Sequence, residues 1–221
     1  MEQEIKKIVI IGPESTGKST LCEQLAQHYN TLWVREYARE YLEKNGADYR
    51  FEDLYEISLG QLAGEELGMG NWQRAIGNRQ GTTDDGQALS GIRNLELGIG
   101  EGTPNNKELP TLQPSTFNLQ PLFIDTDLYV IKVWSEFVFN KTDNRILTEI
   151  AKREYDLYLL CDVDLPWVKD ELREYPDLAV REKLFHYYKE EMIEQKTPWV
   201  IIRGNYEERL AAAIAAVDGL F

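Results

Sequence analysis

The chain has 221 residues, enough for one well-packed domain but not comfortably for two, because domains usually run to about 100–200 residues. With 43% hydrophobic and 28% charged residues, its composition is that of a folded soluble protein. The net charge of -14 excludes a general nucleic-acid binder, because phosphate backbones are held by clustered Lys and Arg. No run approaches the roughly 18 apolar residues that cross a bilayer. We therefore expect one domain, 1–221, that binds neither nucleic acid nor membrane and stays in the cytoplasm.

Short apolar runs alternate with amphipathic stretches along the chain, which is typical of βαβ units and of a parallel sheet covered on both faces. The pattern predicts an α/β fold with five parallel strands and helices on both sides. In chain order we expect strand 5–11, helix 18–29, strand 31–35, helices 36–44 and 51–67, strand 122–125, helices 127–139 and 144–154, strand 156–161, helix 178–195, strand 199–203 and helix 206–217.

Residues 68–121 do not follow this alternation. They hold more than half of the chain's glycines and half of its prolines, together with many Asn, Gln, Thr and Ser, and show no sustained period. Loops of more than about 15 residues inside a compact domain are usually functional or disordered. We interpret 68–121 as a long flexible insertion within the domain, with a lid or a partner-binding segment as the alternative.

Residues 12–19 read G-P-E-S-T-G-K-S, which matches the phosphate-binding pattern G-x-x-x-x-G-K-[ST]. The glycines allow the backbone to turn its N–H groups toward a phosphate, and the helix that follows adds its positive end. Lys18 would reach the β and γ oxygens of ATP, and the Ser19 hydroxyl would bind Mg²⁺. A strand before the motif and a helix after it are what this chemistry requires, so the segment predicts an ATP-dependent phosphoryl-transfer enzyme of the P-loop class.

Carboxylates follow two of the expected strands, where ligands of open α/β sheets bind. The run L-F-I-D-T-D ends with Asp125 and Asp127, and Glu36 follows strand 31–35. Asp125 is the candidate for the acid that holds Mg²⁺. Asp127 could instead cap the next helix, and Glu36 could be a helix first-turn carboxylate that only favours the helix dipole.

Basic residues that neutralise a transferred phosphoryl group should come from a mobile cover. Arg173 and Arg181 flank a proline-interrupted turn after strand 156–161 and are the candidates, with surface salt bridges as the alternative. The loop at Gly204, after the last strand, lies where an adenine could pack against backbone, although a plain turn would look the same.

Four segments, in this order, resemble the ribosylnicotinamide kinase domain of NadR-like NAD-biosynthesis proteins. They are G-P-E-S-T-G-K-S-T-L, V-R-E-Y-A-R-E-Y-L, F-I-D-T-D and Y-D-L-Y-L-L-C-D-V-D-L-P-W-V-K-D-E-L-R. The resemblance covers residues 5–67 and 121–217. It implies a three-layer P-loop sandwich with sheet order 2-3-1-4-5, and the transfer of phosphate from ATP, with Mg²⁺, to the 5′-hydroxyl of nicotinamide riboside.

The resemblance also implies roles for individual residues. Glu36 with Asp125 or Asp127 would engage the riboside hydroxyls and Mg²⁺, Arg39 would support the site, and Asp170 and Arg173 would belong to the lid. The triphosphate would be bound by Gly12, Pro13, Glu14, Ser15, Thr16, Gly17, Lys18, Ser19 and Thr20.

Two features depart from that family. The second, adenylyltransferase activity of full-length NadR proteins carries an H-x-G-H motif, which neither histidine of this chain belongs to. Where the family often has an aromatic residue to stack on the nicotinamide ring, the chain has Arg35. Instead, Trp33, Tyr37, Tyr129 or Trp134 could provide an aromatic face for the nicotinamide ring.

Two other function classes fit a P-loop. A regulatory ATPase would use hydrolysis to change shape, and it would show ATP hydrolysis stimulated by a protein partner and indifferent to small acceptors. A nucleotide sensor would bind without turnover. The arginines of the expected cover favour a kinase over the first, and Lys18, Ser19 and Asp125 favour it over the second.

Overall fold

The computed structural model describes residues 5–80 and 121–221. It divides into two units, Met1–Trp72 with Leu119–Phe221, and Gln73–Asn118. The first unit holds the sheet and the site, and most of the second lies outside the described residues.

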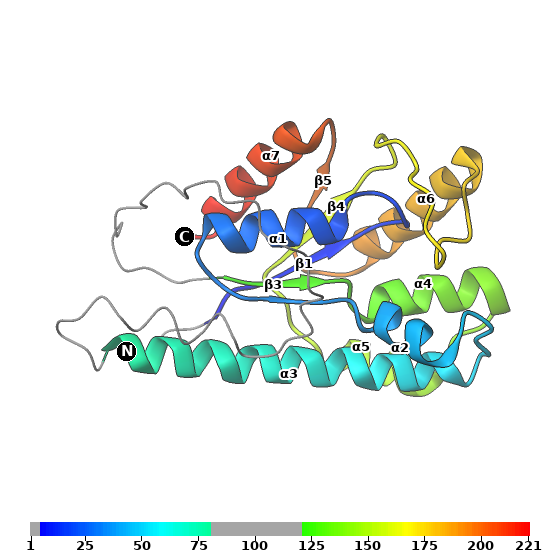
Figure 1. Cartoon of the computed structure of the whole chain (residues 1–221), viewed down its shortest axis with the longest axis horizontal. Helices are drawn as coiled ribbons and strands as arrows, with labels where there is room; N and C mark the ends of the chain where they lie inside the picture. Colours follow the sequence, from blue (N-terminus) through cyan, green and yellow to red (C-terminus); the bar gives the residue numbers. More distant parts are fainter. Residues whose placement is uncertain (1–4, 81–120) are drawn as a thin grey trace. The chain divides into compact units, whose positions relative to one another are not determined.

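The first unit is built on a sheet of five parallel strands (Figure 1). The central strand, β1, lies between β3 and β4, and the order is β2-β3-β1-β4-β5. Ile10 of β1 is opposite Asp125 of β3 and Leu159 of β4, so the carboxyl ends of these strands meet at one edge. The expected order 2-3-1-4-5 is confirmed. The strands are β1 (Lys7–Ile11), β2 (Trp33–Val34), β3 (Leu122–Asp125), β4 (Leu157–Cys161) and β5 (Trp199–Ile202).

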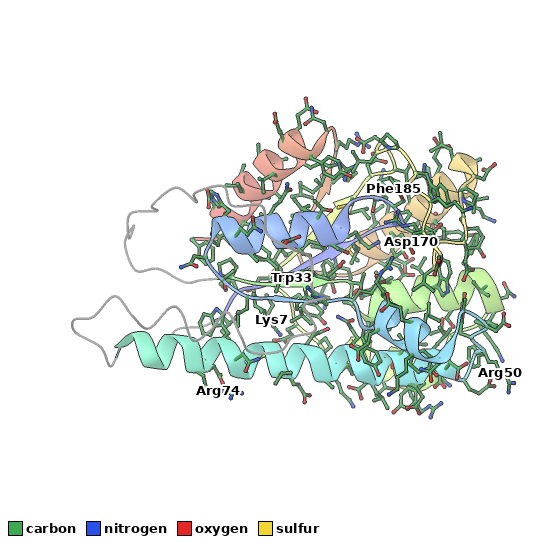
Figure 2. All side chains as sticks on the ribbon, viewed as in Figure 1. Lys7, Trp33, Arg50, Arg74, Asp170 and Phe185 are labelled. Atoms are coloured by element: carbon green, nitrogen blue, oxygen red, sulfur yellow. The ribbon has the colours of Figure 1, made fainter. Side chains whose placement is uncertain are left out.

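Helices cover both faces of this sheet. One face packs on α1 and α7, and the other packs on α4 and α6 (Figures 1 and 2). Apart from Lys7, all residues of the three central strands are buried between these helices. A third apolar cluster joins α2, α3, α4 and α5. The three-layer α/β sandwich is therefore confirmed. The helices are α1 (Lys18–His28), α2 (Tyr37–Asn45), α3 (Asp53–Gln80), α4 (Leu128–Phe139), α5 (Asn144–Lys152), α6 (Leu178–Glu194) and α7 (Tyr206–Asp218).

Helix α3 corrects the expected start of the insertion. The helix does not end at Leu67 but continues to Gln80, so 68–80 is helical, while 81–120 lies outside the described residues. Gly68 is part of the reason for the error. A Cβ on Gly68 would lie 2.7 Å from Val34 of β2, so this glycine lets α3 approach the sheet edge rather than ending the helix. Trp72, one turn further on, is buried.

Two further observations concern the cysteines and the membrane-spanning potential of the helices. Both cysteines, Cys22 and Cys161, are free and buried, as small apolar side chains often are. Among the described helices, none has the length and apolar character to cross a membrane.

Candidate active site

The segment 12–17 forms a tight loop between β1 and α1. Gly12 has φ +138°, and a Cβ there would lie 2.6 Å from the Cys161 carbonyl oxygen, so only glycine fits. Gly17, with φ +79°, precedes the first turn of α1. The Thr16 hydroxyl and the Lys18 ammonium group both donate to the Pro13 carbonyl, at 2.7 and 2.9 Å. The loop thus surrounds the positive end of α1 with backbone and with the lysine, which is an anion-binding arrangement.

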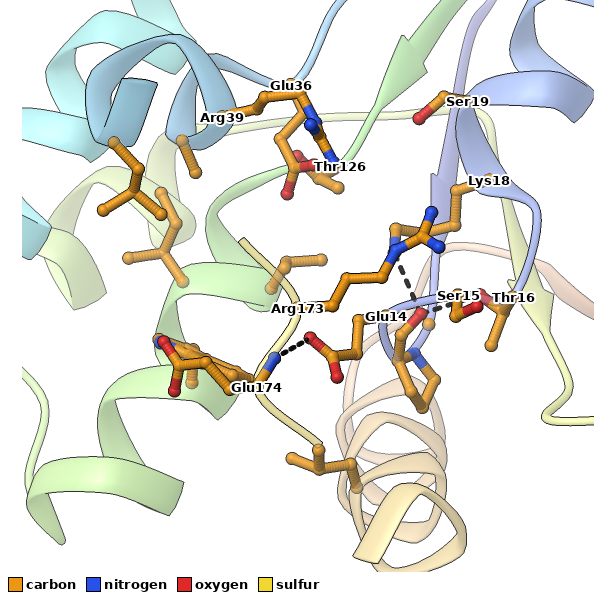
Figure 3. Close-up of a pocket in the computed structure, with 18 of the residues that line it drawn as sticks. Glu14, Ser15, Thr16, Lys18, Ser19, Glu36, Arg39, Thr126, Arg173 and Glu174 are labelled. Carbon is orange, nitrogen blue, oxygen red and sulfur yellow. Dashed lines mark hydrogen bonds between the residues drawn. The ribbon is translucent and has the colours of Figure 1, made fainter. Parts of the chain in front are cut away.

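A cavity of about 220 Å³ opens beside this loop (Figure 3). All of residues 12–20 line the cavity. Glu36 at the N-cap of α2, Arg39 of α2 and Arg173 of the segment after β4 also line it. The structure therefore brings the expected phosphate loop together with Glu36, Arg39 and Arg173. Six expected site residues do not line the cavity: Tyr37, Asp125, Asp127, Tyr129, Arg181 and Gly204.

Asp125 is the last residue of β3, directly before the cavity-lining Thr126, and only 1% of its surface is exposed. Burial, and then the negative charge of Glu36, raise its pKa, while Lys18 and the Ser19 side chain lower it. Its Oδ1 atom has no hydrogen-bond partner in the described part of the chain. An unsatisfied buried oxygen beside a serine hydroxyl suits Mg²⁺, which binds one or two protein oxygens and otherwise phosphate oxygens and water.

Glu36 occupies the N-cap position of α2 but does not use its side chain as a cap. Its carboxylate lies at the cavity wall near Thr126 (Figure 3). Of the three acids considered for the reaction, Glu36, Asp125 and Asp127, Glu36 is the one that lines the cavity.

Gln61 of α3 was missed in the sequence analysis. Its Oε1 accepts a hydrogen bond from the Tyr37 backbone N–H at 2.9 Å, and its Nε2 donates to the Thr126 carbonyl at 3.0 Å. The amide thus ties the start of α2, where Glu36 lies, to the end of β3. Thr126 has φ +66°, a turn that this bond helps to hold. A single Gln between the buried Ile57 and Leu62 was the available signal.

The segment after β4, residues 163–177, is called the lid segment below. Arg173 lines the cavity, and its Nη1 donates to the Val168 carbonyl at 2.6 Å. Asp170 accepts from Arg39 Nη2 at 2.9 Å, joining the lid segment to α2. Arg39 and Asp170 therefore form an ion pair with each other, and the supporting role expected for Arg39 stays a prediction.

Arg181 is not a surface residue, so the salt-bridge alternative is wrong for it. It is 4% exposed on α6, and its Nε and Nη1 atoms lack hydrogen-bond partners among the described residues. It lies one turn before Leu184, which lines the cavity. An unpaired buried guanidinium is costly unless an anion completes it.

The cavity also has apolar and aromatic lining residues. Trp134 lines it beside Leu54, Ile57 and Ile131, and the Trp134 indole N–H donates to the Tyr49 hydroxyl at 2.5 Å. Of the four aromatic candidates from the sequence, only Trp134 lines the cavity.

The other three aromatic candidates have structural contacts. Tyr37 covers Gly60 of α3, and Tyr129 packs edge-on against Tyr158. Trp33 lies under the Arg35 side chain and, in Figure 2, well apart from Asp170 of the lid segment. The sequence did not single out Tyr49.

Asp127 is the N-cap of α4, as the alternative for this residue proposed. One oxygen accepts from the Tyr129 backbone N–H at 3.0 Å and the other from the Tyr158 hydroxyl at 2.7 Å. Because both oxygens are engaged in the interior, the expected contact with substrate is not supported.

Gly204, with φ +94°, donates its N–H to Asp164 at 2.6 Å. It precedes Asn205, which begins α7 with a capping box. The glycine thus occupies a turn outside the cavity.

The parallel sheet, the phosphate loop at the head of α1 and the buried acid at the end of β3 define a P-loop nucleotide-binding protein. A family model for an AAA domain matches residues 7–75 and 115–209. The chain belongs to this family.

The chain is also similar to NadR proteins. It is 22% identical over 214 residues to the trifunctional NAD biosynthesis/regulator protein NadR of Salmonella typhimurium, and 24% identical over 191 residues to that of Escherichia coli. The alignments cover 96% and 86% of this chain but 42% and 36% of those proteins. The chain thus spans less than half the length of these curated relatives.

Solved structures agree on the fold. A crystal structure of NadR in complex with NR matches with a TM-score of 0.64 at 20% identity, covering 98% of this chain and 51% of that one. A NadR complex with NAD and AMP-PNP matches with a TM-score of 0.61, also at 20% identity, covering 98% and 49%. The resemblance seen in the sequence is confirmed, and at this identity it establishes the architecture.

Proposed function

We propose that the chain is an ATP-dependent kinase that phosphorylates nicotinamide riboside to nicotinamide mononucleotide. The observation that carries the proposal is a single cavity that is lined both by the charged Lys18, Glu36 and Arg173 and by the aromatic Trp134. A phosphate-binding end joined to an aromatic end suits two substrates, one with a polyphosphate and one with a flat ring. The NadR structure whose title names NR supports the choice of acceptor.

Each residue of this site has a defined part in the transfer. The backbone N–H groups of the loop 12–17, apart from Pro13, which has none, and the Lys18 ammonium group hold the phosphates of ATP. Glu36 accepts the proton of the riboside hydroxyl, since its carboxylate reaches the cavity and caps no helix amide. Arg173 offsets negative charge on the phosphoryl group, and the lid segment keeps water away.

Mg²⁺ would be held by Ser19 and Asp125. When bound, it neutralises charge on the phosphate oxygens. The residues fit such an ion, because Asp125 keeps an unsatisfied oxygen beside the Ser19 side chain. The described residues contain no cluster of three or more acidic, His or Cys ligands, which suits an ion that takes most of its ligands from phosphate and water.

The test is ADP release with ATP, Mg²⁺ and a panel of acceptors that holds nicotinamide riboside, adenosine, cytidine and their deoxy forms. We expect release that depends on nicotinamide riboside. Release that depends on another nucleoside would leave a kinase but reject the named acceptor. Release that no acceptor changes would favour the regulatory ATPase instead.

A further inference from the structure

The lid segment is bound directly to the phosphate loop. Glu14 accepts backbone N–H groups from two consecutive residues of the lid segment, Glu174 at 3.0 Å and Tyr175 at 2.5 Å, one on each carboxylate oxygen. The Ser15 hydroxyl accepts a third, from Val168 at 2.9 Å. Figure 3 shows the Glu14 contact beside Arg173 and Lys18. Two side chains of the phosphate loop thus fix the lid segment at both ends of the stretch that carries Arg173.

A carboxylate is an unexpected neighbour for a polyphosphate site, because like charges repel. The two lid amides give the Glu14 carboxylate donors of its own, and hydrogen bonds to a charged acceptor are roughly twice as strong as neutral ones. In keeping with this closeness, burial and then the Glu14 charge raise the pKa of Glu174. The carboxylate is thus turned toward the lid segment.

Arg173 immediately precedes the two residues that Glu14 holds. Fixing the Glu174 and Tyr175 amides fixes the backbone from which the Arg173 side chain leaves, and the Arg173 bond to the Val168 carbonyl closes the turn from the other side. We propose that Glu14 is a positioning residue: it couples the phosphate loop to the lid segment and so sets Arg173 against the transferred phosphoryl group. The inference rests on the proposed phosphoryl transfer, although the contact itself does not.

A double-mutant cycle tests the coupling. We expect Glu14→Ala and Arg173→Ala each to lower kcat about 10- to 100-fold, with a smaller change in the KM for ATP. The double variant should be no worse than the poorer single variant within about threefold, because both changes remove the same placed guanidinium. Glu14→Gln keeps one acceptor oxygen, so its kcat should lie between those of the wild type and Glu14→Ala. If the loss of kcat in the double variant equals the product of the losses in the two single variants, the proposal is overturned.

A second measurement separates this proposal from the proposed function. Hydrogen exchange of peptides from the lid segment should be faster in Glu14→Ala and unchanged in Glu171→Gln, a matched loss of charge at an exposed position of the same segment. Unchanged hydrogen exchange in Glu14→Ala would overturn the proposal that Glu14 holds the lid segment. If hydrogen exchange accelerates but no acceptor supports turnover, the proposed kinase function is rejected, whereas the proposal that Glu14 holds the lid segment is retained. In that case the Glu14/Arg173 double-mutant cycle is measured as the affinity for AMP-PNP. Losses of binding free energy that add up in the double variant would reject the coupling between Glu14 and Arg173.

Discussion

Replacing Gln61 by Met tests whether this buried amide positions the acid of the site. Met keeps the length and nearly the volume of Gln, so packing is retained at a position that is 2% exposed. The change removes the acceptor of the Tyr37 N–H and the donor to the Thr126 carbonyl. At about 1–1.5 kcal/mol for each bond, the free energy of unfolding should fall by about 2–3 kcal/mol. For a chain of this size the Tm should fall by roughly 4–12 °C.

The same change should reduce turnover. Because Tyr37 follows Glu36 directly, freeing the start of α2 should lower kcat about tenfold with little change in the KM for ATP. Urea unfolding and steady-state kinetics measure the two effects. Gln27→Met, at an exposed position of α1, is the matched control. A loss of less than about 0.5 kcal/mol together with an unchanged kcat would refute the reasoning.

Three further predictions concern buried charge and the aromatic end. Arg181→Met should raise the Tm of the free protein but shrink the Tm increase caused by AMP-PNP, because it removes an unpaired cation that an anion would complete; an undiminished increase would contradict this. Burial, and then the charge of Asp127, raise the pKa of Glu65 to about 7, from 4.5. A raised carboxyl pKa stabilises the protein below pH 4.5, and this contribution of up to about 3 kcal/mol is lost as the pH rises through 7. Urea unfolding of Glu65→Gln should therefore show a flatter pH dependence than the wild type between pH 4.5 and 7, and equal slopes would contradict it. Trp134→Ala should raise the KM for nicotinamide riboside about 5- to 150-fold in ADP-release assays while the KM for ATP changes less than about threefold, since stacking on a ring is worth about 1–3 kcal/mol; equal changes in both would argue against a ring-binding role.

The strands could be predicted because their signals were local, whereas their order was implied by the resemblance to the NadR-like kinase domain. β1, β3 and β4 are continuous apolar runs, and β1 leads into a phosphate motif that specifies what must precede and follow it. The residues 12–20 could be located for the same reason. An anion loop is encoded within one short segment.

Features that depend on contacts between distant segments could not be predicted in this way. Gly68 looked like a helix breaker, but it lies where α3 must approach Val34, and only the packed structure shows this neighbour. Gln61 looked like one polar residue on an apolar helix, although it joins α2 to β3. Asp127 lies two residues after Asp125, and the sequence could not decide whether it caps a helix or contacts substrate. The structure decides this because the Tyr158 hydroxyl donates a hydrogen bond to Asp127 in the interior.

The aromatic candidates show the same limit. Several rings near the motifs were equally plausible from the sequence. Trp134 lines the cavity because α4 presents it there, whereas Tyr129, five residues earlier on the same helix, packs against Tyr158 of the sheet. Tyr49 lies in the connection between α2 and α3, where no periodic pattern indicates its direction.

The most direct test of the account is to detect the product by mass spectrometry after incubating the chain with ATP, Mg²⁺ and nicotinamide riboside, in parallel with Lys18→Ala. We expect nicotinamide mononucleotide to form with the wild type, and Lys18→Ala to form it at least about 10²-fold more slowly with an unchanged Tm, because one charged contact to the phosphoryl group is lost. Full product formation by Lys18→Ala, or ATP consumed while the riboside stays unmodified, would contradict phosphoryl transfer at this loop.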